Sequence, residues 1–264
     1  MIVHFSKYHG TGNDFVIIDG RDQDTSHFTS GLIHRLCDRR FGIGSDGLII
    51  LEEGDLADFK MRYFNADGRE GSMCGNGGRC ITAFAHHLGI CGSEAAFEGM
   101  DGMHSASLLP NGDIRLKLKD VNAIKPDEDG YLLDTGSPHF VKFVNGLDQL
   151  DVAQEGKEIR HQARFDPGGV NVNFVETGSN PGQISVRTFE RGVEAETYSC
   201  GTGVTAAAIC SYFRQKTDII SYDIQTRGGN LNVSFSVQNH SNFTNVYLTG
   251  PVIQVYNGSM ELDP

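Results

Sequence analysis

Two stretches of the sequence share one pattern, and this pattern limits how the chain can fold. The first, MCGNGGRCITAFA, begins at Met73, and the second, SCGTGVTAAAIC, begins at Ser199. Each reads Cys-Gly-x-Gly and continues with small residues that favour a helix. The leading cysteines, Cys74 and Cys200, lie 126 residues apart in a chain of 264. We therefore expect an internal duplication, with one cysteine at a helix N-terminus in each of two similar halves.

A cysteine in this position is suited to proton transfer. The glycines let backbone N–H groups point at a ligand, as at other helix N-termini. The helix dipole lowers the pKa of a thiol placed there. If both helices hold the carboxylate of one bound molecule, a thiolate on one face accepts a proton and a thiol on the other face donates one. The matched pair thus indicates an enzyme that inverts a stereocentre.

The other cysteines and the composition exclude several classes of protein. Cys37, Cys80, Cys91 and Cys210 fit the usual burial of free cysteine as a small hydrophobe. No C-x-x-C pair suggests a zinc site, and six scattered cysteines make no disulfide scaffold. The net charge of −12, without a basic patch, argues against nucleic acid. No secretory signal or membrane-spanning run is visible, so we expect a cytoplasmic protein.

Short strand-like runs dominate both halves. SASLL and IRLKLKD flank PNGD, which predicts a hairpin. Only three segments have helical patterns: residues 29–40, 75–89 and 201–216. The polar, turn-rich stretch at residues 120–130 is the best candidate linker.

Glycine-rich and lysine motifs do not support a phosphate or pyridoxal site. GIGSDG at residues 42–47 matches G-x-G-x-x-G, but it follows a helix and precedes a strand, the reverse of the dinucleotide-binding order. No motif singles out a lysine for pyridoxal phosphate. We therefore expect neither cofactor nor metal.

Polar residues outside the cysteine motifs offer further candidates. A Cys-His pair is one alternative, and His139, in TGSPHFV, stands at a Pro-marked strand start where a side chain can project into a site. Glu190 and Arg191 directly precede the second cysteine motif. An Arg fork suits a carboxylate and a Glu suits an ammonium, so this pair fits an amino-acid head group, although a solvated turn is the simpler interpretation. The other histidines considered are His4, His9, His86 and His87.

Six motifs together resemble the diaminopimelate epimerase family. They are HGTGNDF, YFNADG, MCGNGGRC, TGSPHFV, GVNVNFV and ERGVEAETYSCGTG, in that family's order, over residues 9–203. The resemblance implies a cofactor-independent enzyme that interconverts LL- and meso-2,6-diaminopimelate for lysine and peptidoglycan synthesis. It also implies an α/β (α+β) fold of two pseudo-symmetric domains, each a curled mixed β-sheet around a central helix, with the site in the cleft between them. We expect domains at residues 1–121, joined by a returning strand at 251–264, and at 122–250.

The resemblance also implies a role for individual residues. Cys74 and Cys200 become the base and acid pair, and His139 and Glu190 become neighbours that tune the two thiols. Glu190 is also expected to contact substrate. Four residues are implied for the distal amino-acid end: Asn13, Asn65, Asn171 and Arg191. Backbone amides are implied for the reacting end, from Gly75, Asn76, Gly201 and Thr202. The expected partner is a small molecule, with no nucleic acid or membrane, and a homodimer is the candidate assembly.

Two positions depart from the family pattern. Many members have Asn at the position of Ser137, where it touches the distal end of the substrate, and some have Gln at the position of Gly47. The shorter Ser137 leaves a gap that a water molecule can bridge.

Two other functions remain open. A proline racemase or 4-hydroxyproline epimerase would use the same two-thiol plan, although a proline ring gives Arg191, Asn65 and Asn171 no distal group to bind. A thiol redox or ligand-binding protein without turnover is the alternative from another class, but it would not need two matched helix N-termini.

Overall fold

The computed structural model describes residues 2–239 and 241–262. Contacts between residues divide the chain into two units. The first unit takes the residues up to Leu116 together with those from Pro251 onward, and the second takes Lys117–Gly250. Within the described residues, the longest apolar helices fall short of what a membrane span requires.

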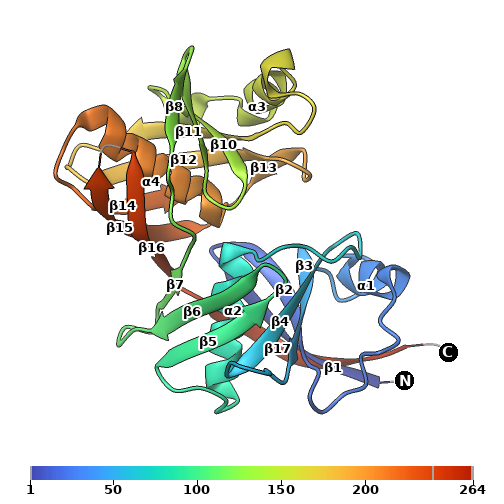
Figure 1. The fold of residues 1–264 in the computed structure, drawn as a ribbon. Coiled ribbons are helices and arrows are strands. Elements are labelled where there is room, and N and C mark those ends of the chain that lie inside the picture. Colours follow the sequence, from blue (N-terminus) through green and yellow to red (C-terminus); the bar gives the residue numbers. More distant parts are fainter. Residues whose placement is uncertain (1, 240, 263–264) are drawn as a thin grey trace. The chain divides into compact units, whose positions relative to one another are not determined.

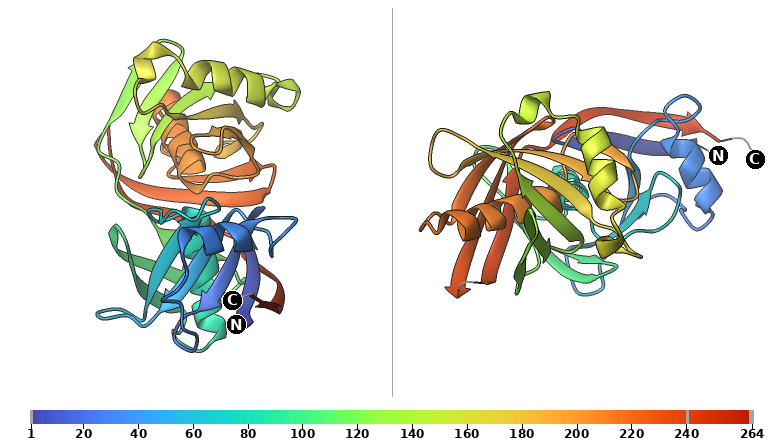
Figure 2. Two further views of the ribbon diagram at one scale, coloured as in Figure 1. Left: turned by 90° about the vertical axis from the view of Figure 1, so that its right-hand side faces the viewer. Right: turned by 90° about the horizontal axis from the view of Figure 1, so that it is seen from above.

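The first unit is a mixed sheet with a helix on each face. Its strands pair in the order β17, β1, β2, β3, β4, β5, β6, β7. β2–β3 and β4–β5 are parallel pairs, and the other neighbours are antiparallel. α1 connects the first parallel pair and α2 the second, as parallel strands need a crossover. Figure 2 shows β1 and β17 running side by side toward the two termini. The bounds are β1 Ile2–Gly10, β2 Asn13–Asp19, α1 Ser30–Cys37, β3 Gly47–Glu52, β4 Phe59–Asn65, α2 Gly75–His87, β5 Glu94–Gly99, β6 Gly102–Leu108, β7 Ile114–Lys117 and β17 Ile253–Glu261.

Both faces of this sheet are buried at its centre. Val16 and Ile18 of β2 join the hydrophobic cluster beneath α1. Ile49 of β3 faces the opposite way, because its side chain lies near Gly77 of α2. Strands covered on both faces read as continuous apolar runs, and β2 and β3 accordingly contain FVII and LIIL.

The second unit repeats this plan. Its strands pair in the order β8, β9, β10, β11, β12, β14, β15, β16, with β13 beside one end of β12. β10–β11 and β12–β14 are parallel, and α3 and α4 connect them. Figure 1 shows α4 among β14, β15 and β16. The bounds are β8 Ile124–Asp127, β9 Gly130–Asp134, β10 Pro138–Phe143, η1 Leu147–Gln149, α3 Val152–Arg160, η2 Ala163–Phe165, β11 Asn171–Thr177, β12 Gln183–Glu190, β13 Ala195–Thr197, α4 Gly201–Gln215, β14 Ser221–Thr226, β15 Gly229–Asn239 and β16 Asn242–Gly250.

The two units have the same strand order and the same pattern of parallel and antiparallel pairs. The strands of the first unit correspond in turn to those of the second: β17, β1, β2, β3, β4, β5, β6 and β7 to β8, β9, β10, β11, β12, β14, β15 and β16. Both parallel pairs fall at equivalent places, so α1 corresponds to α3 and α2 to α4. The predicted duplication and the α+β class are therefore confirmed. The hairpin at PNGD is also confirmed, as an antiparallel β6–β7 pair.

Two expectations about secondary structure were wrong. Residues 120–130 are not a free linker, because Ile124–Asp127 form β8 and pair with β9. A fourth α-helix, α3, lies where no helix was expected.

Candidate active site

Cys74 is the residue from which α2 begins. It takes the N-cap position with extended backbone, φ −101° and ψ 127°, and its side chain makes no capping hydrogen bond. Gly78 N–H donates to Cys74 O at 2.7 Å, the first bond along the helix. The amides of residues 75–77 precede that bond and point out of the helix end. A half-buried thiol therefore stands beside backbone donors that favour an anion.

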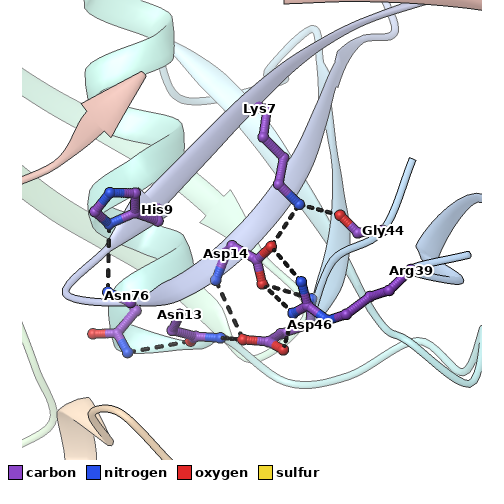
Figure 3. A network of polar contacts seen from close by, with 9 residues as sticks. Lys7, His9, Asn13, Asp14, Arg39, Gly44, Asp46 and Asn76 are labelled. Atoms are coloured by element: carbon purple, nitrogen blue, oxygen red, sulfur yellow. Dashed lines mark hydrogen bonds and ion pairs between the residues drawn. The ribbon is translucent and has the colours of Figure 1, made fainter. Parts of the chain in front are cut away.

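Two asparagine amides lie next to this thiol. Cys74 Sγ lies 3.6 Å from Asn13 Oδ1, and Asn76 Nδ2 donates to the same oxygen at 3.2 Å. The opposite end of the Asn13 amide donates from Nδ2 to Asp46 Oδ2 at 2.9 Å. Figure 3 shows the contacts from Asn76 to Asn13 and from Asn13 to Asp46 at the end of the β1–β2 hairpin. The structure thus brings together three residues that sequence assigned to the site, and adds Asp46.

A charged cluster holds Asp46 in place (Figure 3). Arg39 donates to Asp46 Oδ1 at 2.7 Å and to both carboxylate oxygens of Asp14. Lys7, which is buried, pairs with Asp14 at 2.6 Å and donates to Gly44 O. Burial raises the pKa of the Asp14 carboxyl, but hydrogen bonds from Arg39 and Lys7 outweigh it and lower the pKa to about 2. The Asp14 carboxyl is therefore ionised at neutral pH and can pair with both cations.

Arg79 supports the same helix turn from inside the core. Its side chain is fully buried, and it donates to Asn76 Oδ1 at 2.7 Å and to Pro251 O at 3.0 Å. Among the described residues no carboxylate pairs with it, and its Nε has no hydrogen-bond partner. Burial lowers the pKa of this guanidinium. Burying a cation is costly unless hydrogen bonds compensate for the lost water, and here the bonds to Asn76 Oδ1 and Pro251 O do so and orient the Asn76 side chain.

Cys200 stands at the N-cap of α4 in the same way. Its φ and ψ are −119° and 111°, and Val204 N–H donates to Cys200 O at 2.9 Å. The thiol is 8% exposed, and its Sγ lies 3.5 Å from Thr202 Oγ1. Thr135 Oγ1 donates to Thr202 O at 2.9 Å and fixes the first turn. The backbone N–H groups of residues 201–203 come before the first hydrogen bond of the helix and point out of its N-terminal end, as residues 75–77 do in α2.

A polar group fills the sheet face beneath this helix. His139 of β10 is fully buried, and its Nδ1 lies 3.0 Å from Asn173 Nδ2 of β11. Thr188 of β12 donates to Asn173 Oδ1 at 3.0 Å. A Cβ on Gly203 would lie 2.3 Å from Asn173 Oδ1 and 3.3 Å from Cys200 Sγ, so the asparagine packs directly against the α4 terminus.

Asn171, Ser137 and Arg191 form a second group in this unit. Asn171 Nδ2 donates to Ser137 Oγ at 2.9 Å, and Arg191 N–H donates to Asn171 Oδ1 at 2.9 Å. The Arg191 guanidinium makes longer contacts, at 3.4 Å to Ser137 Oγ and 3.5 Å to Gly168 O. No carboxylate of the described residues pairs with it, so its fork can receive an anion.

Two further expected site residues lie at the ends of equivalent strands. Asn65 is exposed at the end of β4, where its Oδ1 accepts from Tyr63 OH at 3.0 Å. Glu190 is half-buried at the end of β12, paired with Ala195 of β13. Because β4 and β12 are equivalent strands, the two residues occupy the same place in their respective units.

Sequence reasoning missed four residues that hold the site: Asp46, Arg79, Asn173 and Thr188. One signal was available for Asn173. In the run NVNFV, Asn171 and Asn173 alternate with apolar residues and so share one face of β11. Within the described residues no cluster of His, Cys, Asp and Glu is arranged to hold a metal ion.

Known proteins resemble this chain over nearly its whole length. A family model described as diaminopimelate epimerase matches residues 5–125 and 131–255. The diaminopimelate epimerase of Flavobacterium psychrophilum is 48% identical over 250 residues, covering 95% of this chain and 97% of the relative. That of Chlorobaculum tepidum is 42% identical over 261 residues, covering 96% and 99%.

Solved structures share the fold at low identity. A Bacillus anthracis phenazine biosynthesis protein of the PhzF family has a TM-score of 0.78 at 14% identity, covering 99% of this chain and all of that one. A hydroxyproline epimerase from Agrobacterium vitis has a TM-score of 0.71 at 14% identity, covering 100% and 93%. These structures indicate the architecture, whereas the family match extends over both repeats and both cysteine motifs. The chain belongs to the diaminopimelate epimerase family.

Proposed function

We propose that this chain interconverts LL- and meso-2,6-diaminopimelate by a two-cysteine acid–base mechanism, an isomerase step in lysine and peptidoglycan precursor synthesis. Family membership supports the reaction. One observation carries the mechanism: Cys74 and Cys200 occupy the N-caps of α2 and α4, which are equivalent helices in two units of the same topology. A symmetric pair of thiols suits a reaction whose forward and reverse directions differ only in the face that is deprotonated.

The reaction needs one base and one acid. One cysteine, as thiolate, takes the α-hydrogen as a proton, so a C–H bond breaks and an S–H bond forms. The other cysteine, as thiol, gives its proton to the opposite face of the carbon. No electrons are gained or lost overall, and both proton-transfer roles are filled by side chains. We expect activity without a cofactor or a metal, in the presence of a reductant.

The helix N-termini stabilise the charge that develops. Loss of the α-proton moves negative charge onto the neighbouring carboxylate. Amides of Gly75, Asn76, Gly201 and Thr202 lie in the first turns, where donors are aimed outward and the dipole favours an anion. These donors act most strongly on the transition state, which is what raises kcat.

The distal amino-acid end needs its own partners. The Arg191 fork suits a carboxylate, and Asn171 holds the Arg191 backbone. Asn13 and Asn65 are the candidates in the first unit, and Glu190 suits an ammonium. Diaminopimelate supplies distal groups of both charges, and proline supplies neither.

Isotope incorporation tests the proposal. In D2O the donor thiol carries deuterium, so the first meso product formed from LL substrate should carry deuterium at the inverted carbon. Early unreacted LL substrate should stay nearly unlabelled, because a proton returned to the same face is the original one. A substantial amount of unlabelled meso product would contradict a mechanism that uses two thiols. Cys74→Ala and Cys200→Ala should each abolish epimerisation, and proline and 4-hydroxyproline should not react.

The proposal includes a location and an assembly. Six scattered cysteines are too few for a disulfide scaffold in a chain of this length, which supports a cytoplasmic, reducing location. A homodimer stays a prediction, and sedimentation at several protein concentrations would test it.

A further inference from the structure

His139 and Asn173 form a buried pair whose chemistry is set by the atoms around them. Both residues are fully buried, on neighbouring parallel strands β10 and β11. Their closest polar atoms, His139 Nδ1 and Asn173 Nδ2, are 3.0 Å apart. Which of the two atoms donates depends on how the asparagine amide is turned and on which ring nitrogen carries the proton.

Backbone carbonyls decide the orientation of the amide. Asn173 Nδ2 lies 3.2 Å from Phe140 O and 3.5 Å from Asn171 O. Carbonyl oxygens can only accept, so the NH2 group must face them. The reverse orientation would put Asn173 Oδ1 against two oxygens. Thr188 Oγ1 then donates to Oδ1 on the other side, at 3.0 Å.

This orientation leaves His139 Nδ1 with a donor in front of it. Nδ1 must therefore accept, and a neutral ring that accepts at Nδ1 carries its proton on Nε2. We propose that Asn173 holds His139 as the neutral Nε2–H tautomer, so that His139 serves the epimerase as a fixed hydrogen-bond donor and not as a proton acceptor. This role in catalysis rests on the proposed function, whereas the tautomer itself does not.

Charge and burial act in the same direction. The ring is fully buried, and the charged group that acts on it most is the cation Arg191. Burial first, and Arg191 second, lower the pKa of His139 to about 3. Nε2 has no hydrogen-bond partner among the described residues. A buried donor without a partner is available to an acceptor, such as a thiolate or a carboxylate, that comes into place when substrate binds.

Nuclear magnetic resonance tests the tautomer directly. In protein labelled with 15N-histidine, long-range 1H–15N spectra distinguish the two neutral tautomers and the imidazolium, and His139→Gln identifies the His139 signals. We expect the Nε2–H tautomer throughout the range from about pH 5.5 to about pH 8, where ordinary imidazoles change charge. An imidazolium or an Nδ1–H tautomer in this range would overturn the proposal.

Variants test the part played by Asn173. Asn173→Asp puts an acceptor against Nδ1 and should move the proton there. Thr188→Val should leave the tautomer unchanged, because the backbone carbonyls still orient the amide. Asn145→Asp, at an exposed position after β10, controls for the added charge. An unchanged His139 spectrum in folded Asn173→Asp protein would count against the assignment.

Activity separates a donor from a base. His139→Gln keeps an N–H donor without a titratable group, and His139→Met keeps similar bulk without a donor. We expect the Gln variant to retain at least about tenfold more kcat on diaminopimelate than the Met variant. Equal loss in both would mean that proton transfer, not donation, is required. If the wild-type tautomer is as expected but diaminopimelate is not epimerised, the proposed function fails and the tautomer assignment stands.

Discussion

Asp46 Oδ2 accepts a hydrogen bond from Asn13 Nδ2 at 2.9 Å, and the opposite atom of the same amide, Oδ1, lies 3.6 Å from Cys74 Sγ. A carboxylate can only accept, so Asp46 fixes which end of Asn13 faces the thiol. Arg79 does the same for Asn76, whose Oδ1 accepts from the guanidinium while its Nδ2 faces Asn13. Two charges thus orient two neutral amides beside Cys74.

Asp46→Ala should release the Asn13 amide. We expect kcat/KM to fall by about 10- to 100-fold, or about 1.5–3 kcal/mol of transition-state stabilisation, the range for a charge-assisted hydrogen bond. The melting temperature should change little, because the Asp46 side chain is 46% exposed and surface ion pairs contribute little. Asp55→Ala, an exposed acidic residue of the same unit, is the matched control. Steady-state kinetics and melting curves check this prediction. If kcat/KM and the melting temperature both fell, the role of Asp46 would be purely structural.

Asp14 should link stability to pH. Its pKa is lowered in the folded protein, so the stability it adds is present above the unfolded value of 3.8 and is lost as pH falls toward about 2. The shift corresponds to about 2 kcal/mol at most. Asp14→Asn removes this titration, although it also leaves Lys7 unpaired. Urea unfolding of both proteins should therefore show the difference in free energy of unfolding shrinking from about pH 6 to about pH 3. A constant difference would contradict the ion-pair account.

Gly77 and Gly203 occupy the same position in α2 and α4, but they should respond differently to alanine. A Cβ on Gly203 would lie 2.3 Å from Asn173 Oδ1, inside a buried hydrogen-bonded group. A Cβ on Gly77 would lie 3.2 Å and 3.3 Å from the ends of Ile49 and Met61, and at an ordinary contact distance of 3.4 Å from Cys74 Cβ. Gly203→Ala should displace Asn173 and lower kcat at least tenfold, the scale of about 1.4 kcal/mol. Gly77→Ala should lower kcat less than Gly203→Ala does, because the ends of Ile49 and Met61 can shift by a few tenths of an ångström and alanine favours a helix by up to about 1 kcal/mol over glycine. Equal activity of the two variants would argue against a role for Asn173.

The sequence predicted the helix N-termini because the signal there is local. Cysteine, glycines and a small-residue run stand together, and the duplication repeats them. The sequence predicts a linker where β8 lies, because this stretch is polar and turn-rich and contains Pro126. β8 pairs with β9 alone among the described strands, and an edge strand tolerates proline and polar residues. The sequence does not predict α3 for a similar reason. Its buried residues have helical spacing but stand among charged neighbours; they are Val152, Gly156 and Ile159.

The residues that support the site could not be predicted from local pattern. Arg79 looks like an ordinary helical arginine, and only the fold places it in the core beneath Asn76. Asp46 and Asn13 are 33 residues apart and meet because β2 and β3 are parallel neighbours. Such contacts depend on strand register, which is decided by packing of the whole sheet.

Arg191→Lys should separate the proposed substrate from shorter amino acids. The guanidinium contacts Ser137 and Gly168 only at 3.4 and 3.5 Å and pairs with no carboxylate of the described residues, so its fork is available to a distal carboxylate. Lysine keeps the charge but loses the two parallel N–H donors. We expect kcat/KM for diaminopimelate to fall, and the fall to correspond to a loss of roughly 2–4 kcal/mol of transition-state stabilisation. Arg21→Lys, at a turn bound to Asp19, controls for the substitution itself. Wild-type kcat/KM in the Arg191 variant would mean that the distal end is bound elsewhere. A normal rate of α-hydrogen exchange at low occupancy, with a raised KM, would instead show that Arg191 binds substrate without acting on the thiol chemistry.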